Sequence, residues 1–133
     1  MALRLNDPMR SKIIGSGILG GLGTAAVLKI YGGTQPLAGG GATSAGVIVQ
    51  ISAIAWNAPS NGTATLSTSY YGTANGTDGT ASWARLSDTS GTAYVVDGAC
   101  GTSVLSDFII DAEVINGTSV VTLTSADIVQ PAS

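Results

Sequence analysis

The chain lacks histidine altogether and contains a single cysteine, Cys100, among its 133 residues. Without an imidazole, neither Ser-His-Asp nor Cys-His catalysis can be built, and histidine-bound metal sites are excluded as well. A single cysteine cannot form a disulfide within the chain, so the fold has to depend on packing. Cys100 lies between Ala99 and Gly101, where we expect a small buried hydrophobic side chain and not a reactive thiol. The sequence therefore predicts a protein that is not an enzyme.

Charge is scarce as well. Charged residues make up 10% of the chain, against about 25% in an average protein, while hydrophobic residues make up 44%. A surface so poor in charge suits a chain packed against neighbours better than a freely diffusing monomer. We therefore expect the chain to self-associate, most simply as a homotrimer.

The few charges are unevenly distributed. The first twelve residues carry three basic side chains and one acid, whereas the rest of the chain carries two basic side chains and seven acids. A basic segment on an acidic body predicts docking onto an acidic partner surface, although three basic side chains can equally well face only water. The residues expected to contact a partner here are Leu3, Arg4, Leu5, Arg10 and Lys12. The acidic body has no basic patch interleaved with aromatics, so we expect no nucleic-acid partner.

The apolar run over residues 13–28 resembles the core of a secretory signal or a membrane anchor. It contains five glycines between Gly15 and Gly23 and is shorter than the roughly 20 residues that a membrane-spanning helix needs. We therefore expect neither a targeting segment nor a membrane partner.

Two segments with different patterns follow one another along the chain. Asp7 is a good N-cap and Pro8 fits the first helical position, which predicts a short helix over residues 8–14 that fades near Gly15. Residues 1–24 are therefore interpreted as an N-terminal arm with a short helix and a glycine-rich segment. From residue 25 to residue 133 we expect one β domain, because the hydrophobic period changes to two.

Seven segments of this domain are rich in β-branched or aromatic residues and short enough for an antiparallel sheet: 25–31, 47–55, 63–70, 80–87, 92–97, 104–115 and 118–124. The pattern predicts an all-β fold, an antiparallel β-sandwich of the jelly-roll or immunoglobulin-like type. Asn-Gly dipeptides at 61–62, 75–76 and 116–117 are typical of type I′ hairpin turns.

The clearest hairpin is expected on either side of Asn116-Gly117. Its first arm places Phe108, Ile110, Ala112 and Val114 on one face, and Asp107, Asp111 and Glu113 on the other. We expect Phe108, Ile110, Val114, Val121 and Leu123 in the core. The three acids could bind a hard cation, but their spread along one strand favours a solvated face.

Two other features could carry a ligand. Residues 15–20 match the dinucleotide pattern G-x-G-x-x-G, but no strand precedes them and no acid follows until Asp78, so no cofactor is expected. Residues 32–46 contain no charge and are too long for a tight turn, so they form either a binding loop or a passive connector.

Large aromatic side chains are few. Trp83 lies in the middle of a predicted strand and is expected in the core, whereas Trp56 ends a strand and is expected at a rim or an interface. Tyr70 and Tyr71 lie beside a glycine turn and could belong to either environment. An exposed coplanar row of Trp56 with the two tyrosines would favour carbohydrate binding.

Three stretches carry a resemblance to a known family: MALRLND at residues 1–7, LKIYGGTQP at residues 28–36, and WAR at residues 83–85 with the following SDTSGT at 87–92. In these stretches the chain resembles small virion proteins of tailed bacteriophages. Members of that family have an Ala-Leu-Arg-Leu arm, a short helix and β strands that end in a Thr/Val-rich hairpin, whereas this chain has glycines at 15–23 in place of a more helical segment. The resemblance implies a structural virion component.

Within that class, a capsid decoration (cement) protein that clamps neighbouring capsomers is the leading hypothesis. Its partners would be the major capsid protein or other virion proteins together with further copies of itself, and its location would be the virion, assembled in the host bacterial cytoplasm. A tail or neck component and a carbohydrate-binding β module of a virion are the alternatives.

Overall fold

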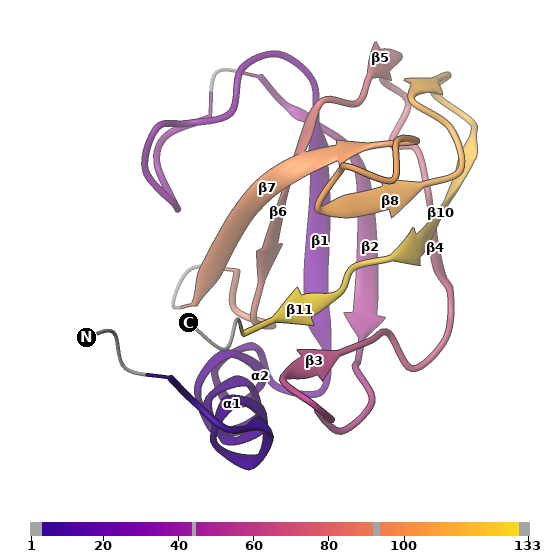
Figure 1. Cartoon of the computed structure of the whole chain (residues 1–133). Helices are drawn as coiled ribbons and strands as arrows, with labels where there is room; N and C mark the ends of the chain where they lie inside the picture. Colours follow the sequence, from indigo (N-terminus) through magenta and orange to yellow (C-terminus); the bar gives the residue numbers. More distant parts are fainter. Residues whose placement is uncertain (1–3, 44, 92–93, 131–133) are drawn as a thin grey trace.

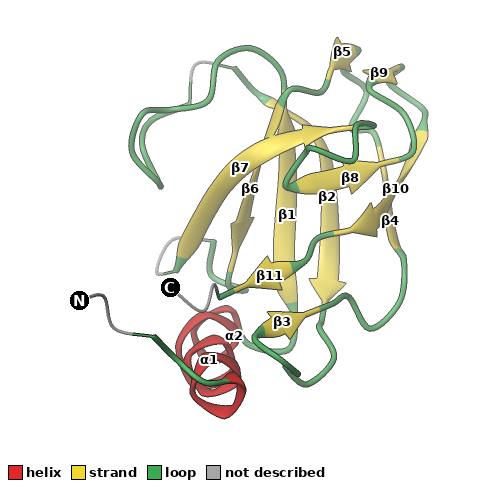
Figure 2. Cartoon of the chain, viewed as in Figure 1, coloured by secondary structure: helices red, strands yellow, loops and turns green. Residues whose placement is uncertain are grey.

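A computed structural model describes residues 4–43, 45–91 and 94–130, and shows one helix packed at an end of a curled β-sheet (Figures 1 and 2). The helix runs through α1 (Asp7–Ile13), a π turn labelled η1 (Ile14–Ile18) and α2 (Leu19–Leu22). Its N-cap is Asn6, whose side-chain Oδ1 accepts a hydrogen bond from the Met9 amide at 3.1 Å. The N-cap was predicted one residue too late, at Asp7.

The helix does not fade at Gly15 as predicted but continues to Leu22. Leu22 belongs to the hydrophobic core, Ile18 packs against that core, and Ile14 on the same helical face is fully buried. Glycine in this helix permits close packing: a Cβ at Gly21 would lie 3.1 Å from the Tyr94 ring. The prediction was wrong because tertiary packing outweighs the low helix propensity of glycine.

The strands follow the helix along the chain. They are β1 (Ala26–Tyr31), β2 (Val47–Ile54), β3 (Thr63–Ala64), β4 (Tyr70–Thr73), β5 (Gly79–Thr80), β6 (Trp83–Ser87), β7 (Val95–Gly101), β8 (Phe108–Ile110), β9 (Val114–Ile115), β10 (Val120–Ser125) and β11 (Ile128–Val129). Seven of them form one sheet in the order β2-β1-β6-β7-β8-β10-β4, and two small sheets pair β11 with β3 and β5 with β9. The β-rich class with an N-terminal helix is confirmed.

The main sheet is mixed and nearly closes on itself. All of its pairs are antiparallel except β7 with β8, which run parallel through Cys100–Phe108 and Gly101–Ile109. At the opposite ends of the strand order, β2 and β4 meet at a Val49–Ala74 bridge. A side chain at Gly72 would overlap the carbonyl oxygen of Gln50 across this seam, so glycine permits the close approach. The seven strands thus belong to one curled, barrel-like sheet.

The core fills the inside of this sheet. It takes alternate residues of the long strands, such as Leu28 and Ile30 of β1 and Ala84 and Leu86 of β6, together with Leu22 of the helix. Alternation of this kind was expected for strands with one buried face. Trp83 is 1% exposed, as predicted, but it lies on the outer face, where its ring stacks on Tyr31 with centroids 4.4 Å apart.

Several predicted strands are interrupted. The expected strand over residues 104–115 divides into β8 and β9, and the residues between them bring Val114 to the surface, where it is 72% exposed. Phe108, Ile110, Val121 and Leu123 are buried as predicted. Placing Val114 in the core was wrong, because a shift of one residue exchanges the two faces; its neighbour Ile115 is buried instead.

The three Asn-Gly dipeptides form different turns. Asn61 and Gly62 both have positive φ, as a type I′ turn requires, and Ser60 and Thr63 exchange backbone hydrogen bonds across it. Gly76 alone of the second pair has positive φ, and neither residue of the third pair does, so the type I′ prediction is wrong there. In each dipeptide the glycine amide donates a hydrogen bond. Gly62 donates to Ser11 Oγ, Gly76 donates to the carbonyl of Gly117, and Gly117 donates to Asp78 Oδ1.

Candidate functional site

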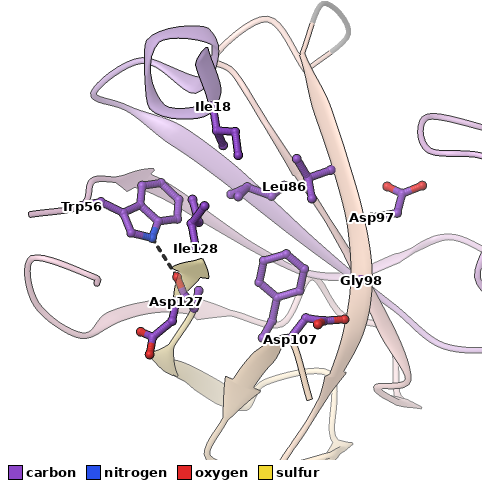
Figure 3. A pocket seen from close by; sticks show the side chains of 11 residues that line it. Ile18, Trp56, Leu86, Asp97, Gly98, Asp107, Asp127 and Ile128 are labelled. Carbon is purple, nitrogen blue, oxygen red and sulfur yellow. Dashed lines mark hydrogen bonds between the residues drawn. The ribbon is translucent and has the colours of Figure 1, made fainter. Parts of the chain in front are cut away.

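An apolar pocket opens between the helix, β7 and β11 (Figure 3). We call it the Trp56 pocket; its volume is ≈ 240 Å³, and its lining consists of Ile18, Trp56, Leu86, Val96, Asp97, Gly98, Asp107, Phe108, Ala126, Asp127 and Ile128. Figure 3 shows the side chains of Ile18, Leu86 and Ile128 gathered beside the Trp56 indole. Val96 lies on the inner side of β7 beside Leu86, yet it is 43% exposed. The pocket is therefore a part of the inner sheet face that the helix leaves uncovered.

Trp56 forms one wall of this pocket and is half-buried. Its Nε1 donates a 2.8 Å hydrogen bond to the Ala126 carbonyl, and its backbone forms a bridge with Leu66. These contacts fix the indole plane between the β2–β3 connection and the C-terminal strand. Trp56 is thus half-buried in the wall of the pocket, and the partner contact predicted for it stays a prediction.

Three carboxylates lie around the pocket, but they differ in availability. Asp97 points to the far side of β7 and binds Arg85 there (Figure 3). Asp107 accepts a 2.9 Å hydrogen bond from the Ala99 amide through Oδ2, and Asp127 is exposed. Asp107 and Asp127 therefore give the pocket an acidic rim around an apolar interior.

The outer face of β6 and β7 carries an ion pair that holds the loop over residues 32–46. Arg85 binds Asp97 through Nε at 2.7 Å and through a second nitrogen at 2.9 Å, and it also donates to the Gly41 carbonyl. Asp97 accepts a further bond from the Gly40 amide. The hydrogen bond to Asp97 raises the pKa of Arg85. This ion pair holds the loop in place beside Trp83.

The residues predicted to contact a partner are distributed over different environments. Arg4 and Lys12 are exposed and Leu5 is half-buried, whereas Leu3 lies outside the described residues. Arg10 binds within its own chain: it contacts Asp7, and its guanidinium donates to the Gln130 carbonyl at 3.1 Å. Of the predicted contact residues that the structure describes, Trp56 alone lines the pocket.

Cys100 is buried, as predicted. Burial raises the pKa of its thiol to about 12, with a smaller contribution from Glu113. A thiol that remains protonated at neutral pH is a poor nucleophile and a poor metal ligand.

The acids at 107, 111 and 113 satisfy backbone amides. Asp111 accepts from the Thr122 amide at 2.9 Å, and Glu113 accepts from both the amide and the hydroxyl of Thr102. Asp107 and Asp111 are exposed, as predicted for a solvated face, and Glu113 is half-buried, while each of the three also accepts a hydrogen bond from a backbone amide. Across the described residues, no three Asp, Glu, Cys or His side chains cluster as a metal site would need.

The aromatic residues considered for carbohydrate binding do not form a row. The Tyr70 hydroxyl is engaged with Ser67 Oγ at 2.6 Å and with the backbone of Ala55. Tyr71, the next residue of β4, is 72% exposed. Because successive residues of a strand point to opposite faces, the two tyrosines cannot share one platform with Trp56.

The pocket itself was missed by the sequence analysis. Its walls come from the helix, the β2–β3 connection, β6–β8 and β11, and β11 was not predicted as a strand. One signal was available: Ile14, Ile18 and Leu22 recur every four residues, which is the spacing of a helix face.

Comparison of the chain with family models, with curated proteins and with solved structures finds no match. Within the part of the chain that the structure describes, no helix is long and apolar enough to cross a membrane.

Proposed function

We propose that this chain is a structural component of a tailed-bacteriophage particle, a capsid decoration protein that binds the outer capsid surface and stabilises neighbouring capsomers. The proposal rests on the sequence resemblance and on one structural observation. Two loops present aliphatic side chains to solvent while hydrogen bonds to the sheet hold those loops in position. Exposed apolar side chains on held loops are suited to docking against another protein.

The first of these loops, residues 102–107, joins the parallel strands β7 and β8. Val104 is 85% exposed and Leu105 is 90% exposed. Glu113 holds the start of the loop through Thr102, and a turn between Ser103 and Ser106 holds its tip. The two aliphatic side chains therefore have a defined position before any partner binds.

The second loop covers residues 32–46, of which residue 44 lies outside the described part. Leu37 at its tip is fully exposed. Arg85 and Asp97 bind Gly41 and Gly40 of this loop from the sheet. We therefore favour a binding role for the loop over that of a passive connector.

In this proposal the partners are the major capsid protein or other virion proteins, together with further copies of the chain, most simply as a homotrimer. The location is the virion, assembled in the host bacterial cytoplasm, and the role is one of binding and not of catalysis. A tail or neck component is the second candidate, because docking loops suit either position. The jelly-roll or immunoglobulin-like assignment is kept as part of the proposal, since a strongly curled sheet encloses one core as a sandwich does.

The test is to purify particles from a host that carries the gene, detect the chain, and count its copies. A capsid decoration protein is expected at hundreds of copies on the shell, and a neck protein at about a dozen or fewer. A chain that is absent from purified particles would contradict both candidates.

A matched pair of variants tests the docking loops. Replacing Val104 and Leu105 together by serine should reduce the copies bound per particle, because the aliphatic contacts are lost. Replacing Val129, which is 58% exposed on β11, by serine should leave the copy number unchanged. Equal binding by both variants would show that loop 102–107 is not the attachment point.

A further inference from the structure

The volume of the Trp56 pocket limits what it can hold. At ≈ 240 Å³ it is larger than a cavity of about 150 Å³ that accommodates benzene, but smaller than the roughly 300–1,000 Å³ of sites that enclose a whole small molecule. A single large apolar side chain fits this range. The lining, with Leu86 and Phe108 at the sheet and Ile18 at the helix, suits an aliphatic group.

The charges of the pocket add a second requirement. Asp107 and Asp127 lie among the lining residues, and the lining includes no lysine or arginine. Asp97 is neutralised by Arg85 on the outer face, so the first two carboxylates set the local charge. The occupant should therefore carry a basic residue next to its apolar side chain.

The chain itself contains one such segment outside its helices and strands. Of its five basic residues, Arg4 alone is flanked by leucines, Leu3 and Leu5. Arg10 and Arg85 are bound to Asp7 and Asp97 within the chain. Arg4 is exposed in a stretch without secondary structure, directly before α1.

This segment cannot reach the Ile18 wall of its own pocket. Asn6 fixes the start of the helix, and Ile18 lies twelve residues further along, a rise of about 18 Å. Three extended residues before Asn6 span at most about 11 Å. A segment that fills the pocket as far as Ile18 must therefore come from another molecule.

We propose that the Trp56 pocket binds the Leu3-Arg4-Leu5 segment of a second copy of this chain. One leucine enters the apolar interior, and the Arg4 guanidinium lies at the rim between Asp107 and Asp127. Because the donating and accepting surfaces differ, the contact is head-to-tail and generates either a closed ring or an open chain. The inference does not depend on the virion role.

The first test fills the pocket with an added aromatic ring and leaves the buried core side chains unchanged. Sedimentation of the wild-type chain over a range of concentrations should show self-association, and Val96→Phe should abolish it. The matched control is Val129→Phe, which adds the same ring to an exposed valine of β11 and should associate normally. A wild-type chain that stays monomeric at high micromolar concentration would overturn the proposal, and so would equal association of the two variants with unchanged circular dichroism.

The second test uses a labelled peptide with the sequence of residues 1–7 and measures its binding to the full chain. Replacing either leucine in the peptide by alanine tests the anchor, and the leucine that enters the pocket should show a loss of roughly tenfold or more. Arg4→Ser in the peptide should weaken binding about two- to fivefold at low salt. In the full chain, Lys12→Ser removes an equal charge from the helix and should leave association unchanged.

A charge exchange identifies the rim. Asp127→Lys should weaken binding of the wild-type peptide, and an Arg4→Asp peptide should bind this variant better than it binds the wild-type chain. Asp88→Lys serves as the matched control away from the pocket lining. A scrambled peptide of the same composition that binds equally well would show that the pocket accepts any basic apolar segment, which would overturn the assignment to a second copy. Failure of these tests would leave the particle-binding result unaffected.

Discussion

Two parts of the molecule, a long-strand half and a short-strand half, are held together in different ways. The long-strand half, β1, β2, β6 and β7, has strands of five to eight residues. Its β1–β6 and β6–β7 ladders are continuous, and its β1–β2 ladder has two register shifts. The short-strand half, β3, β4, β5 and β8 to β11, has strands of two to six residues. There, side chains such as Glu113, Asp111 and Asp78 accept hydrogen bonds from backbone amides that do not bond to the backbone of a neighbouring strand.

This difference indicates where the chain can vary its surface. A continuous ladder fixes the backbone by repetition, whereas a carboxylate fixes one amide at a time and allows the backbone to change direction between strands. The docking loop 102–107 and the rim residue Asp107 both belong to the part that carboxylates hold. The long-strand half provides the stable frame and carries loop 32–46, whereas the short-strand half carries loop 102–107 and the acidic rim of the pocket.

The largest effect is expected from Phe108, which joins the halves at the start of β8. Phe108→Ala should lower the free energy of unfolding by about 3–5 kcal/mol, because the ring is 5% exposed and packs in the core. Val114→Ala, on an exposed side chain of the same half, should cost less than about 0.5 kcal/mol. Urea unfolding measures both, and a loss below about 1 kcal/mol for Phe108→Ala would contradict the placement of β8.

The second largest loss of stability is expected at the seam, where β2 of the long-strand half meets β4. Gly72→Ala should destabilise the chain by about 3 kcal/mol, because the added methyl group overlaps the Gln50 carbonyl and the seam has to open. Gly39→Ala is the control, since a Cβ there meets nothing within 4 Å. Thermal unfolding compares the two variants, and similar midpoints would show that the seam is not closed.

A smaller effect is expected where a carboxylate replaces a ladder bond. Glu113→Ala removes both acceptor contacts to Thr102 and should cost about 1–2 kcal/mol, with faster amide exchange in loop 102–107. Glu113→Gln retains a side-chain oxygen acceptor and should lose less. If both variants exchange at the wild-type rate, the loop is held by other contacts.

The smallest effect concerns pH and Cys100, at the end of β7. In the unfolded chain the thiol has its ordinary pKa of 9.0, whereas in the folded chain burial raises that pKa to about 12. The unfolded state therefore binds fewer protons above pH 9, and stability falls as pH rises through that window, by about 1 kcal/mol at pH 10. Cys100→Ala should lose less stability than wild type between pH 8 and pH 10 in urea unfolding. Equal losses would show that Cys100 does not cause the decrease.

The frame could be predicted from the sequence far better than the other half. The strand predicted over residues 25–31 is β1, which begins one residue later and ends at Tyr31 as expected. Its buried residues Leu28 and Ile30 alternate with the half-buried Val27 and Lys29, which is the period of a half-buried strand. Alternation is a local signal, so a long regular strand reveals itself without knowledge of its neighbours.

The short-strand half could not be predicted in the same way. Asp111 and Glu113 were interpreted as a solvated strand face, and Asp111 is exposed, but the pattern did not reveal that they also bind the amides of Thr122 and Thr102, which the turns of the fold bring next to them. Such contacts end a strand where local propensity would continue it. The Trp56 pocket was missed for the same reason, since its walls come from segments that only the tertiary fold brings together.

The three Asn-Gly turns have a consequence for the chemical ageing of the protein. Asparagine before glycine deamidates when the glycine nitrogen attacks the side-chain carbonyl, which forms a succinimide and releases ammonia. In the folded chain each of these nitrogens donates its hydrogen to another acceptor: Ser11 Oγ, the Gly117 carbonyl or Asp78 Oδ1. The attacking atom is thus held in a hydrogen bond at every one of these dipeptides, so we expect deamidation to be slower in the folded chain than in the unfolded chain.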